Sequence, residues 1–569
     1  MVSRGPDGAG LLIEGNIALA HRRLAVIDTS EAGAQPMTTP DGRFHLLYNG
    51  ELYNDAELRA DLISVGAAVG GFRGSCDTET VLWAFATWGP EAFSRMRGMF
   101  SVAVYDTREQ VLHLARDPLG IKPLYYHIGN GELTFASEPK ALLAHPKIDV
   151  MPNMPMASAY LSTLCTTLGR NTMFNDVWVL KPGERAEFDA RTGEMRSGDY
   201  YKPVEVSKDK MTSDEAADLV RGVLEDSVEK HLRSDVPLSA LLSGGLDSTI
   251  ICQTARESVR GLNTWCAGAQ ELGSANTDFE FAREAASSMG AQHTEVAIDG
   301  DKFREDWPTL IERGGLPLST PNEIAIHAVA KDMRKQGFVV TLSGEGADEL
   351  FGGYELALQM AENFCYSPAD KRSGGRFQLE SSAWVAPHVK PHLLSSLAWG
   401  ASNGDRLLNE QYDELYKQCE REVGEAGTPL DAHLRFLRKN NLTGLLQRLD
   451  RSTMLASIEG RTPFADVAVA EVADSLPMNL KLGGRGKQVL RDAWRGEIPE
   501  SIVDRKKQSF ALPFQNWVSE LAWRLDTSPF AKMFFGDKMR REVQLDAKRH
   551  WQLAWPMLNL ALWGDSWFG

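Results

Sequence analysis

Two apolar segments of this chain each lead directly into a glycine-rich turn and then into a helical pattern. The first, Val236–Leu242, ends at SGGLDS (Ser243–Ser248) and continues into a helix at Thr249–Arg256. The second, Phe338–Leu342, ends at SGEGADELFGGY (Ser343–Tyr354). A strand, a glycine turn and a helix, repeated in this order, are typical of a parallel α/β sheet with its site at the carboxyl ends of the strands. We therefore expect both turns at one edge of such a sheet.

The SGGLDS turn has the chemistry of a phosphate-binding loop. Gly244 and Gly245 allow a tight turn in which successive N–H groups point into one concavity, and the following helix adds the positive end of its dipole. Ser243 and Ser248 supply hydroxyl donors. Asp247 would repel phosphate, so it is better suited to hold a Mg²⁺ ion that bridges phosphate oxygens. The sequence contains neither GxxxxGK[ST] nor a strand-linked GxGxxG, so this is a different type of nucleotide site, or else a serine-capped βα turn.

The chain of 569 residues is too long for one hydrophobic core, and the pattern of apolar, polar and turn-forming residues changes along its length. Residues 1–150 alternate short strands with Gly, Asn and Asp turns, which predicts an antiparallel α+β domain. The expected elements are strands at Ile17–Ile27, Phe44–Tyr48, Phe100–Asp106 and Val111–Ala115 and a helix at Asp77–Trp88.

A connector rich in proline, glycine and charge is expected over residues 151–211. Thr212-Ser-Asp-Glu215 then reads as a capping box that opens a helix. From there to residue 569 we expect an α/β domain with a helical C-terminal extension.

Composition excludes several classes of partner. The net charge of −16 argues against binding nucleic acid or an anionic membrane, because both are polyanionic surfaces. No apolar run approaches the roughly 18 residues of a membrane span, and the N-terminus lacks the apolar core of a signal peptide. The six cysteines have no zinc-site spacing and suit a reducing cytoplasm. The sequence does not give the oligomeric state, and a homodimer stays open.

Four motifs in the second part carry a family resemblance. In order they are SGGLDS, SGEGADELFGGY, RSTMLASIEGRTPFAD (Arg451–Asp466) and RKKQSF (Arg505–Phe510). The first is similar to the pyrophosphate loop of the ATP-pyrophosphatase group. The set resembles the synthetase domain of the glutamine-hydrolysing asparagine synthetase family, which implies ATP and Mg²⁺ as cofactors.

The resemblance also implies roles for particular residues. Asp247 and Asp348 match the Mg²⁺ carboxylates, and Glu345 matches a glutamate tied to the acyl-adenylate. Lys507 matches a lysine that neutralises charge at the α-phosphate, where a preplaced ammonium would stabilise the transition state; it also stands in a basic run that can be a solvated face. The positions that match ATP-binding residues are Leu241, Ser243, Gly244, Gly245, Asp247, Ser248, Ala267, Ser343 and Gly344.

Plainer interpretations exist for other charged residues in these motifs. Asp450 and Arg451 can be a surface pair, and Glu459 with Arg461 a structural salt bridge.

The first domain resembles the glutaminase domain of class II glutamine amidotransferases, an N-terminal-nucleophile fold of αββα layers. The resemblance implies that Arg23 clamps the glutamine carboxylate and Asp77 its α-amino group. Asn49 and Gly50 would form the oxyanion hole, and Glu51 follows them in the same glutamine-binding motif, YNGELYN. These residue types suit the binding of glutamine, because an arginine fork matches a carboxylate and two hydrogen-bond donors stabilise an oxyanion.

The start of the chain departs from that family, whose nucleophile is a cysteine at the first position. This sequence begins Met1-Val2-Ser3. Either the start is an internal methionine of a longer protein, or the chain lacks glutaminase activity and uses free ammonia. We favour the first, an N-terminal truncation, because the expected glutamine-binding residues are present. Cys76 lies beside Asp77, but a small buried thiol is its simpler interpretation.

The expected activity is therefore ATP-dependent amide ligation. Aspartate would be adenylated on its β-carboxylate, and ammonia, drawn from glutamine in a full-length chain, would displace AMP to give asparagine. Amidation or ring closure of another carboxylate in a secondary pathway is the alternative within this chemistry. A non-catalytic regulatory paralogue is the alternative of another class, and it would be favoured by loss of Asp247, Asp348 or Glu345, none of which is lost.

Overall fold

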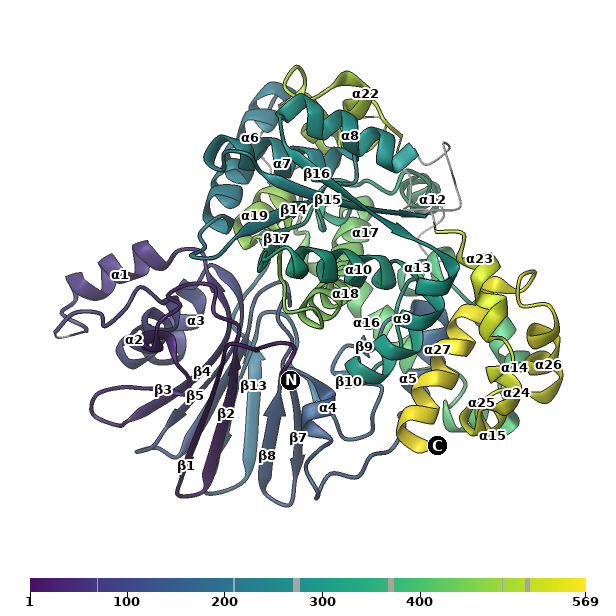
Figure 1. Cartoon of the computed structure of the whole chain (residues 1–569), viewed down its shortest axis with the longest axis horizontal. Coiled ribbons are helices and arrows are strands. Elements are labelled where there is room, and N and C mark those ends of the chain that lie inside the picture. Colours follow the sequence, from purple (N-terminus) through teal and green to yellow (C-terminus); the bar gives the residue numbers. More distant parts are fainter. Residues whose placement is uncertain (69, 208–209, 270–276, 367–372, 484, 507–511) are drawn as a thin grey trace.

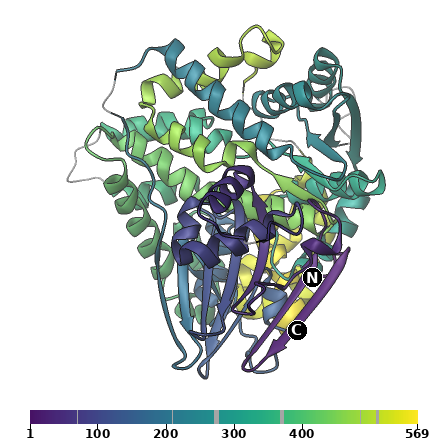
Figure 2. The same ribbon diagram turned by 90° about the vertical axis from the view of Figure 1, so that its left-hand side faces the viewer.

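The computed structural model describes residues 1–569 except 69, 208–209, 270–276, 367–372, 484 and 507–511. Figure 1 shows the antiparallel strands of the first part at the lower left, a second sheet with its helices above them, and the C-terminal helices on the right. Figure 2 shows the strands of the first part below helices of the second. The two parts lie against each other, so residues from both can share a site.

A six-stranded antiparallel sheet forms the centre of the first unit. Its strand order is β13-β12-β6-β5-β4-β3. Helices α1 (Asp55–Ser64), α2 (Asp77–Trp88) and α3 (Ala92–Arg95) cover one face, where the core includes Phe85, Phe93 and Phe100. The strands are β3 (Met37–Thr38), β4 (Phe44–Leu52), β5 (Gly98–Asp106), β6 (Val111–Arg116), β12 (Glu184–Asp189) and β13 (Glu194–Asp199). The antiparallel α+β architecture expected here is confirmed.

A second layer of strands packs against the opposite face of this sheet. Tyr105, Leu114 and Phe188 of the first sheet share a core with Leu133 and Phe135 of the second. The second sheet has the order β8-β7-β11-β10-β9, and β1 pairs with β2 as a separate hairpin. The bounds are β1 (Gly8–Glu14), β2 (Ile17–Arg23), β7 (Tyr125–Gly129), β8 (Glu132–Ala136), β9 (Thr167–Leu168), β10 (Asn171–Thr172) and β11 (Trp178–Val179).

The structure differs from the expected connector over residues 151–211. That segment contains α5 (Met154–Thr163) and strands β9 to β13, and β12 hydrogen-bonds to β6 of the first unit. The glycines that suggested a linker mark turns instead, since Gly183 and Gly193 have φ values of +68° and +74°. Residues up to 199 therefore complete the sheets of the first unit, and the capping box at Thr212 opens α6 (Ser213–His231) as expected.

The second unit contains the expected parallel sheet, with the strand order β16-β15-β14-β17-β18 and every neighbouring pair parallel. β14 and β17 lie side by side although about a hundred residues separate them. The strands are β14 (Leu238–Leu241), β15 (Asn263–Ala269), β16 (Gln292–Ile298), β17 (Val340–Leu342) and β18 (Glu459–Arg461). The order reverses between β14 and β17, and such a switch point is where open α/β sheets bind ligands.

Helices cover both faces of this sheet. α6, α7 (Leu246–Ser258), α8 (Thr277–Met289) and α19 (Val467–Ser475) share a core on one face. The other core includes α9 (Gly300–Gly314), α10 (Asn322–Lys335) and the C-terminal helix α27 (Trp551–Phe568).

The C-terminal helix is an internal core element. Trp555 stacks on Trp307 of α9 with ring centroids 4.5 Å apart, and Asn559 accepts a hydrogen bond from the Trp307 indole. Within the described part of the chain, no helix combines the length and apolar character that a membrane crossing requires.

One helical segment of the C-terminal extension is irregular. α17 (Pro429–Leu437) continues through a π-helical turn at Arg438–Leu442 into α18 (Thr443–Met454). π-Helical turns insert an extra residue into a helix and occur frequently at functional sites. α18 supplies several of the charged side chains described below.

Candidate active site

The SGGLDS turn lies at the carboxyl end of β14 and begins α7. The Ser248 hydroxyl accepts a hydrogen bond from the Ser243 backbone N–H at 3.1 Å, and the two serine hydroxyls are also 3.1 Å apart. Gly244 has φ +67°, and a Cβ there would come within 2.3 Å of the Phe281 carbonyl carbon. The turn therefore requires glycine at this position on both conformational and steric grounds.

We expect Gly244→Ala to disrupt this turn. The new methyl group must displace the backbone of α8, and a side chain is strained at this φ, so stability should fall by about 1–3 kcal/mol. Gly244→Ala should also weaken the binding of ATP, which calorimetry measures. Gly222→Ala on the same domain is the control, because a Cβ there meets nothing within 4 Å. Unchanged ATP affinity in Gly244→Ala would contradict the assignment of this turn.

The two carboxylates expected to hold Mg²⁺ are brought together, and a lysine lies between them. Lys487 contacts Asp247 at 2.7 Å and Asp348 at 2.5 Å, although its side chain is only 5% exposed. Asp247 comes from the turn after β14, whereas Asp348 comes from α11 (Ala347–Phe351), which follows β17. Gly353 makes room for this cluster, because a Cβ there would clash with both Asp348 and Lys487.

These residues fit a Mg²⁺ ion that is also bound by substrate phosphates. Mg²⁺ in nucleotide sites is usually held by one or two carboxylates together with phosphate oxygens and water. Asp247 and Asp348 provide that pair at the mouth of the phosphate turn. Among the described residues there is no group of three or more His, Cys, Asp or Glu side chains that would form an all-protein metal site.

Glu345, in the loop between β17 and α11, pairs with an arginine of α18. Arg448 contacts its carboxylate at 2.5 Å and donates a second hydrogen bond to the Thr320 hydroxyl at 3.1 Å. Burial opposes the charge of Arg448, but the carboxylates of Glu345 and Glu323 nevertheless raise the pKa of this guanidinium. One turn later on α18, Arg451 pairs with the buried Glu323, which also accepts a hydrogen bond from the Ser319 hydroxyl.

A cavity of about 360 Å³ joins these groups, and it is called the nucleotide cavity after the ATP-binding residues expected there. Its wall includes almost all the positions expected to bind ATP, together with Glu345, Asp348 and Lys487. Gly244 is not part of the lining, but its carbonyl accepts a hydrogen bond from Arg505 at 2.9 Å. The expected catalytic Lys507 lies outside the described residues. The expected ATP-binding residues in the wall are Leu241, Ser243, Gly245, Asp247, Ser248, Ala267, Ser343 and Gly344.

The expected glutamine-binding residues surround another cavity, of about 560 Å³ and mainly in the first unit, which is called the glutamine pocket after this expectation. Asn49 and Gly50 lie on β4, where Gly50 faces Phe100 of β5 so closely that a Cβ would come within 2.1 Å of the Met99 carbonyl oxygen. Arg23 donates to the backbone carbonyls of Ile27, Asp28 and Ser30, which leaves only part of its guanidinium for a ligand.

Two buried carboxylates belong to the same cavity. Asp77 accepts a hydrogen bond from the Leu52 N–H at 2.8 Å, and burial raises its pKa to about 6. Burial also raises the pKa of Glu51 well above its usual range, although Arg461 opposes this shift from 3.2 Å. Arg461 comes from β18 of the other unit and also pairs with Glu459 at 2.8 Å.

The Glu459–Arg461 pair therefore connects the two units. Arg461 is 1% exposed, and its backbone carbonyl accepts a hydrogen bond from the N–H of Ser343, the first residue after β17. Arg461 thus contacts the loop after β17 through its backbone and the glutamine pocket through its side chain.

Cys76 lines the glutamine pocket but has the properties of a structural thiol. Burial raises its pKa to about 12, and its sulfur contacts the Thr78 hydroxyl at 3.3 Å. A thiol with so high a pKa is almost entirely protonated at neutral pH, and the thiolate is the nucleophilic form.

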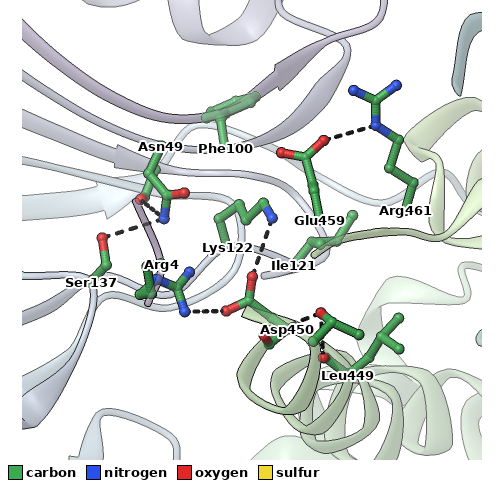
Figure 3. A network of polar contacts seen from close by, with 12 residues as sticks. Arg4, Asn49, Phe100, Ile121, Lys122, Ser137, Leu449, Asp450, Glu459 and Arg461 are labelled. Carbon is green, nitrogen blue, oxygen red and sulfur yellow. Dashed lines mark hydrogen bonds and ion pairs between the residues drawn. The ribbon is translucent and has the colours of Figure 1, made fainter. Parts of the chain in front are cut away.

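Asp450 is an interdomain residue, and the interpretation of Asp450 with Arg451 as a surface pair is wrong. Asp450 is buried between Arg4 at 2.8 Å and Lys122 at 3.1 Å, both from the first unit (Figure 3). The same view shows Asn49 of the glutamine pocket, to the left of this cluster, donating a hydrogen bond to the Ser137 hydroxyl.

An intermediate cavity of about 250 Å³ lies at this interface. It shares Arg4 and Ser137 with the glutamine pocket, and it shares Tyr354, Leu445 and Arg448 with the nucleotide cavity. The three cavities consequently adjoin in a row from one unit to the other.

Comparison with known proteins agrees with this two-part arrangement. The family model described as asparagine synthase matches residues 219–565, and the glutamine amidotransferase domain matches residues 1–201. The chain belongs to the asparagine synthase family. As a member it is an ATP-using carbon–nitrogen ligase with an attached glutamine amidotransferase domain.

Individual relatives carry two kinds of name. Asparagine synthetase [glutamine-hydrolyzing] 1 of Bacillus subtilis is 32% identical over 547 residues, covering 91% of this chain and 83% of the relative. Asparagine synthetase B of Escherichia coli is 27% identical, covering 90% and 77%. A protein named Amidase chyE, from Penicillium rubens, is also 27% identical, covering 90% and 84%.

Sequence reasoning did not single out Lys487 or Arg448. Lys487 follows Gly486 in a short turn with φ +53°, and no local pattern marks it as a partner of two aspartates. Arg448 stands one turn before the motif that begins at Arg451. The signal that could have found it is the i, i+3 spacing of two arginines on one helix face.

Proposed function

We propose that this enzyme adenylates a carboxylate and that ammonia then displaces AMP to form an amide. One observation carries the proposal: the turns after β14 and β17 meet around one cavity that holds Asp247, Asp348, Lys487 and Glu345. A carboxylate oxygen would attack the α-phosphorus of ATP, and the bond to pyrophosphate would break. Ammonia would then attack the acyl carbon, and the bond to AMP would break.

The protein groups have distinct proposed roles. Mg²⁺ held by Asp247 and Asp348 would supply positive charge to the phosphate oxygens. Lys487, which contacts the same two carboxylates, would contact the departing pyrophosphate beside that ion. Glu345, held by Arg448, would accept the proton that the attacking ammonia loses. Lys507 remains the proposed partner of the α-phosphate.

The acceptor carboxylate has two candidates. Aspartate, giving asparagine, is suggested by the names of the Bacillus and Escherichia relatives. A different carboxylate is favoured by the amidase-named relative and by the largely uncharged wall of the intermediate cavity. The row of three cavities supports a route for ammonia from glutamine to the acyl-adenylate.

The test is a stoichiometric assay of ATP cleavage. With MgATP, ammonium and a panel of carboxylic acids, we expect AMP and pyrophosphate to be released one for one with the amide. Repeating the assay with glutamine in place of ammonium measures the coupling of the two units. Release of ADP and phosphate instead would exclude the acyl-adenylate route.

Glutamine binding should depend on the protonation of Asp77. The proposed ion pair with the α-ammonium of glutamine needs the carboxylate, whose pKa is raised to about 6 by burial. Affinity should therefore be highest above pH 6 and fall as pH drops through that value. Calorimetric titration with glutamine between pH 5 and pH 8 measures this, and Asp77→Asn should remove the dependence. A pH-independent affinity in the unmodified protein would rule out the proposed contact.

A further inference from the structure

The intermediate cavity at the domain interface is larger than a passage for ammonia requires. Its volume is about 250 Å³, and it opens into the nucleotide cavity at Tyr354, Leu445 and Arg448. Glu345 is held by Arg448 at this junction, so the cavity begins where the acyl group would be formed. The cavity can therefore hold the body of the acceptor while its carboxylate reaches the nucleotide.

The charged side chains in the described wall of this cavity already have partners. Each arginine there contacts a carboxylate within 4.0 Å, and both acidic residues of the wall contact Arg4. Lys122 adds a second contact to Asp450. Together, the charged wall residues and their partners make four cations and four carboxylates. The cations are Arg4, Lys122, Arg448 and Arg451, and the carboxylates are Glu138, Glu323, Glu345 and Asp450.

A free amino acid is a poor match to such a wall. Aspartate carries an α-ammonium and an α-carboxylate in addition to the reacting carboxylate. Each would be taken out of water, and a buried charge without a partner is costly. To give either charge a counter-ion of its own, the wall would have to open an existing pair, such as Arg451 with the buried Glu323.

The rest of the described wall is uncharged and partly aromatic. Trp384 and Tyr412 contribute rings, and Leu164 and Leu316 contribute alkyl groups. The Gln447 side chain accepts a hydrogen bond from Thr167, while its buried amide nitrogen has no partner among the described residues. Other uncharged lining residues include Thr166, Asn440 and Asn441. Such a wall suits apolar surface with a few hydrogen-bonding groups.

We propose that the acceptor is a carboxylic acid with an uncharged body larger than the side chain of aspartate, seated in the intermediate cavity. Its apolar or aromatic part lies between Trp384, Tyr412 and the leucines. This inference rests on the proposed function and specifies its substrate class.

Carboxylate-dependent exchange of labelled pyrophosphate into ATP tests the inference without ammonia. The panel compares aspartate with N-acetyl-aspartate α-methylamide and N-benzoyl-aspartate α-benzylamide, which keep the β-carboxylate and remove both α-charges, and with 3-phenylpropanoate. We expect kcat/KM for at least one uncharged-body acid to exceed that for aspartate by 100-fold or more. Exchange with aspartate equal to or better than with all of these acids overturns the substrate class and leaves the adenylation proposal intact. If MgATP raises the Tm but no acid supports exchange, the adenylation proposal fails, and the inference fails with it.

A cavity-filling variant tests the location. Asn441→Trp places a bulky ring in the π-helical turn that lines the cavity, and we expect at least a tenfold loss in kcat/KM for the best uncharged acid with unchanged affinity for ATP. Asn409→Trp, on the exposed face of α16 (Arg406–Glu422), is the matched control and should retain full activity. Equal activity of the two variants would show that the acceptor does not occupy this cavity.

Discussion

Replacing Lys487 with methionine is expected to reduce carboxylate-dependent pyrophosphate release by about 10²–10³-fold, the scale seen when one preorganised transition-state donor is removed. The ammonium of Lys487 lies within 2.7 Å of Asp247 and 2.5 Å of Asp348, so it is fixed at the proposed phosphate site before ATP binds. Without it, Asp247 and Asp348 lose the cation between them, and the negative charge on the departing pyrophosphate loses one protein cation of this cavity. Steady-state kinetics in saturating MgATP measures the loss.

The control for this change is Lys548→Met, which removes an exposed lysine far along the C-terminal segment. It should retain full activity, and the Tm of both variants reports whether folding is preserved. If Lys487→Met is properly folded and keeps pyrophosphate release within threefold of the unmodified enzyme, Lys487 has no part in the reaction and only holds the two aspartates together.

Replacing Arg461 with methionine is expected to lower the apparent free energy of unfolding by about 3–5 kcal/mol, the usual cost of leaving a buried charge without its partner. Arg461 is the cation between Glu51 and Glu459, and it also donates to the carbonyls of His231 and Arg233. Because its backbone supports Ser343, the variant should also weaken ATP binding. Urea unfolding and calorimetry measure the two effects.

The pH dependence of the Arg461→Met effect has a definite sign. Burial raises the pKa of Glu51, so its folded-state pKa exceeds the unfolded value of 4.5. The ionised side chain therefore penalises the folded state at higher pH, and the penalty is relieved as pH falls toward 4.5. The loss in free energy of unfolding caused by Arg461→Met should therefore be smaller at pH 6 than at pH 8.

The control for this change is Arg406→Met, which removes an exposed i,i+4 pair with Glu410. It should lower the free energy of unfolding by about 0.5 kcal/mol or less at either pH. A loss in free energy of unfolding that is as small for Arg461→Met would contradict the role of Arg461 as the counter-ion of Glu51 and Glu459.

Local sequence patterns predicted the elements that local physics determines. The apolar run before Ser243 and the glycines after it specify a strand and a tight turn, and β14 and α7 appear there. The capping box at Thr212 begins α6 in the same way. The parallel sheet followed from the repetition of this strand–turn–helix unit, because side-by-side parallel strands need a long crossover between them.

Features that depend on distant pairing were not predicted from sequence. The strands β12 and β13 belong to the first unit because β12 pairs with β6, about seventy residues earlier, and nothing within the segment indicates that partner. Asp450 was interpreted as a surface residue because its two partners, Arg4 and Lys122, lie more than three hundred residues away. For the same reason Lys487 could not be connected to Asp247 and Asp348 before the turns were placed in space.

The π-helical turn at Arg438–Leu442 gives α18 a rotational phase relative to α17 that a continuous α-helix would not have. Deleting one residue there would restore a regular α-helix and change the phase between the two halves by about 100°. The asparagines of the turn would then leave the cavity wall, whereas Arg448, Asp450 and Arg451, lying beyond it, could keep their partners. A single codon gained or lost at this turn could therefore exchange one acceptor for another without altering the adenylation machinery, which offers an economical route for divergence within the family.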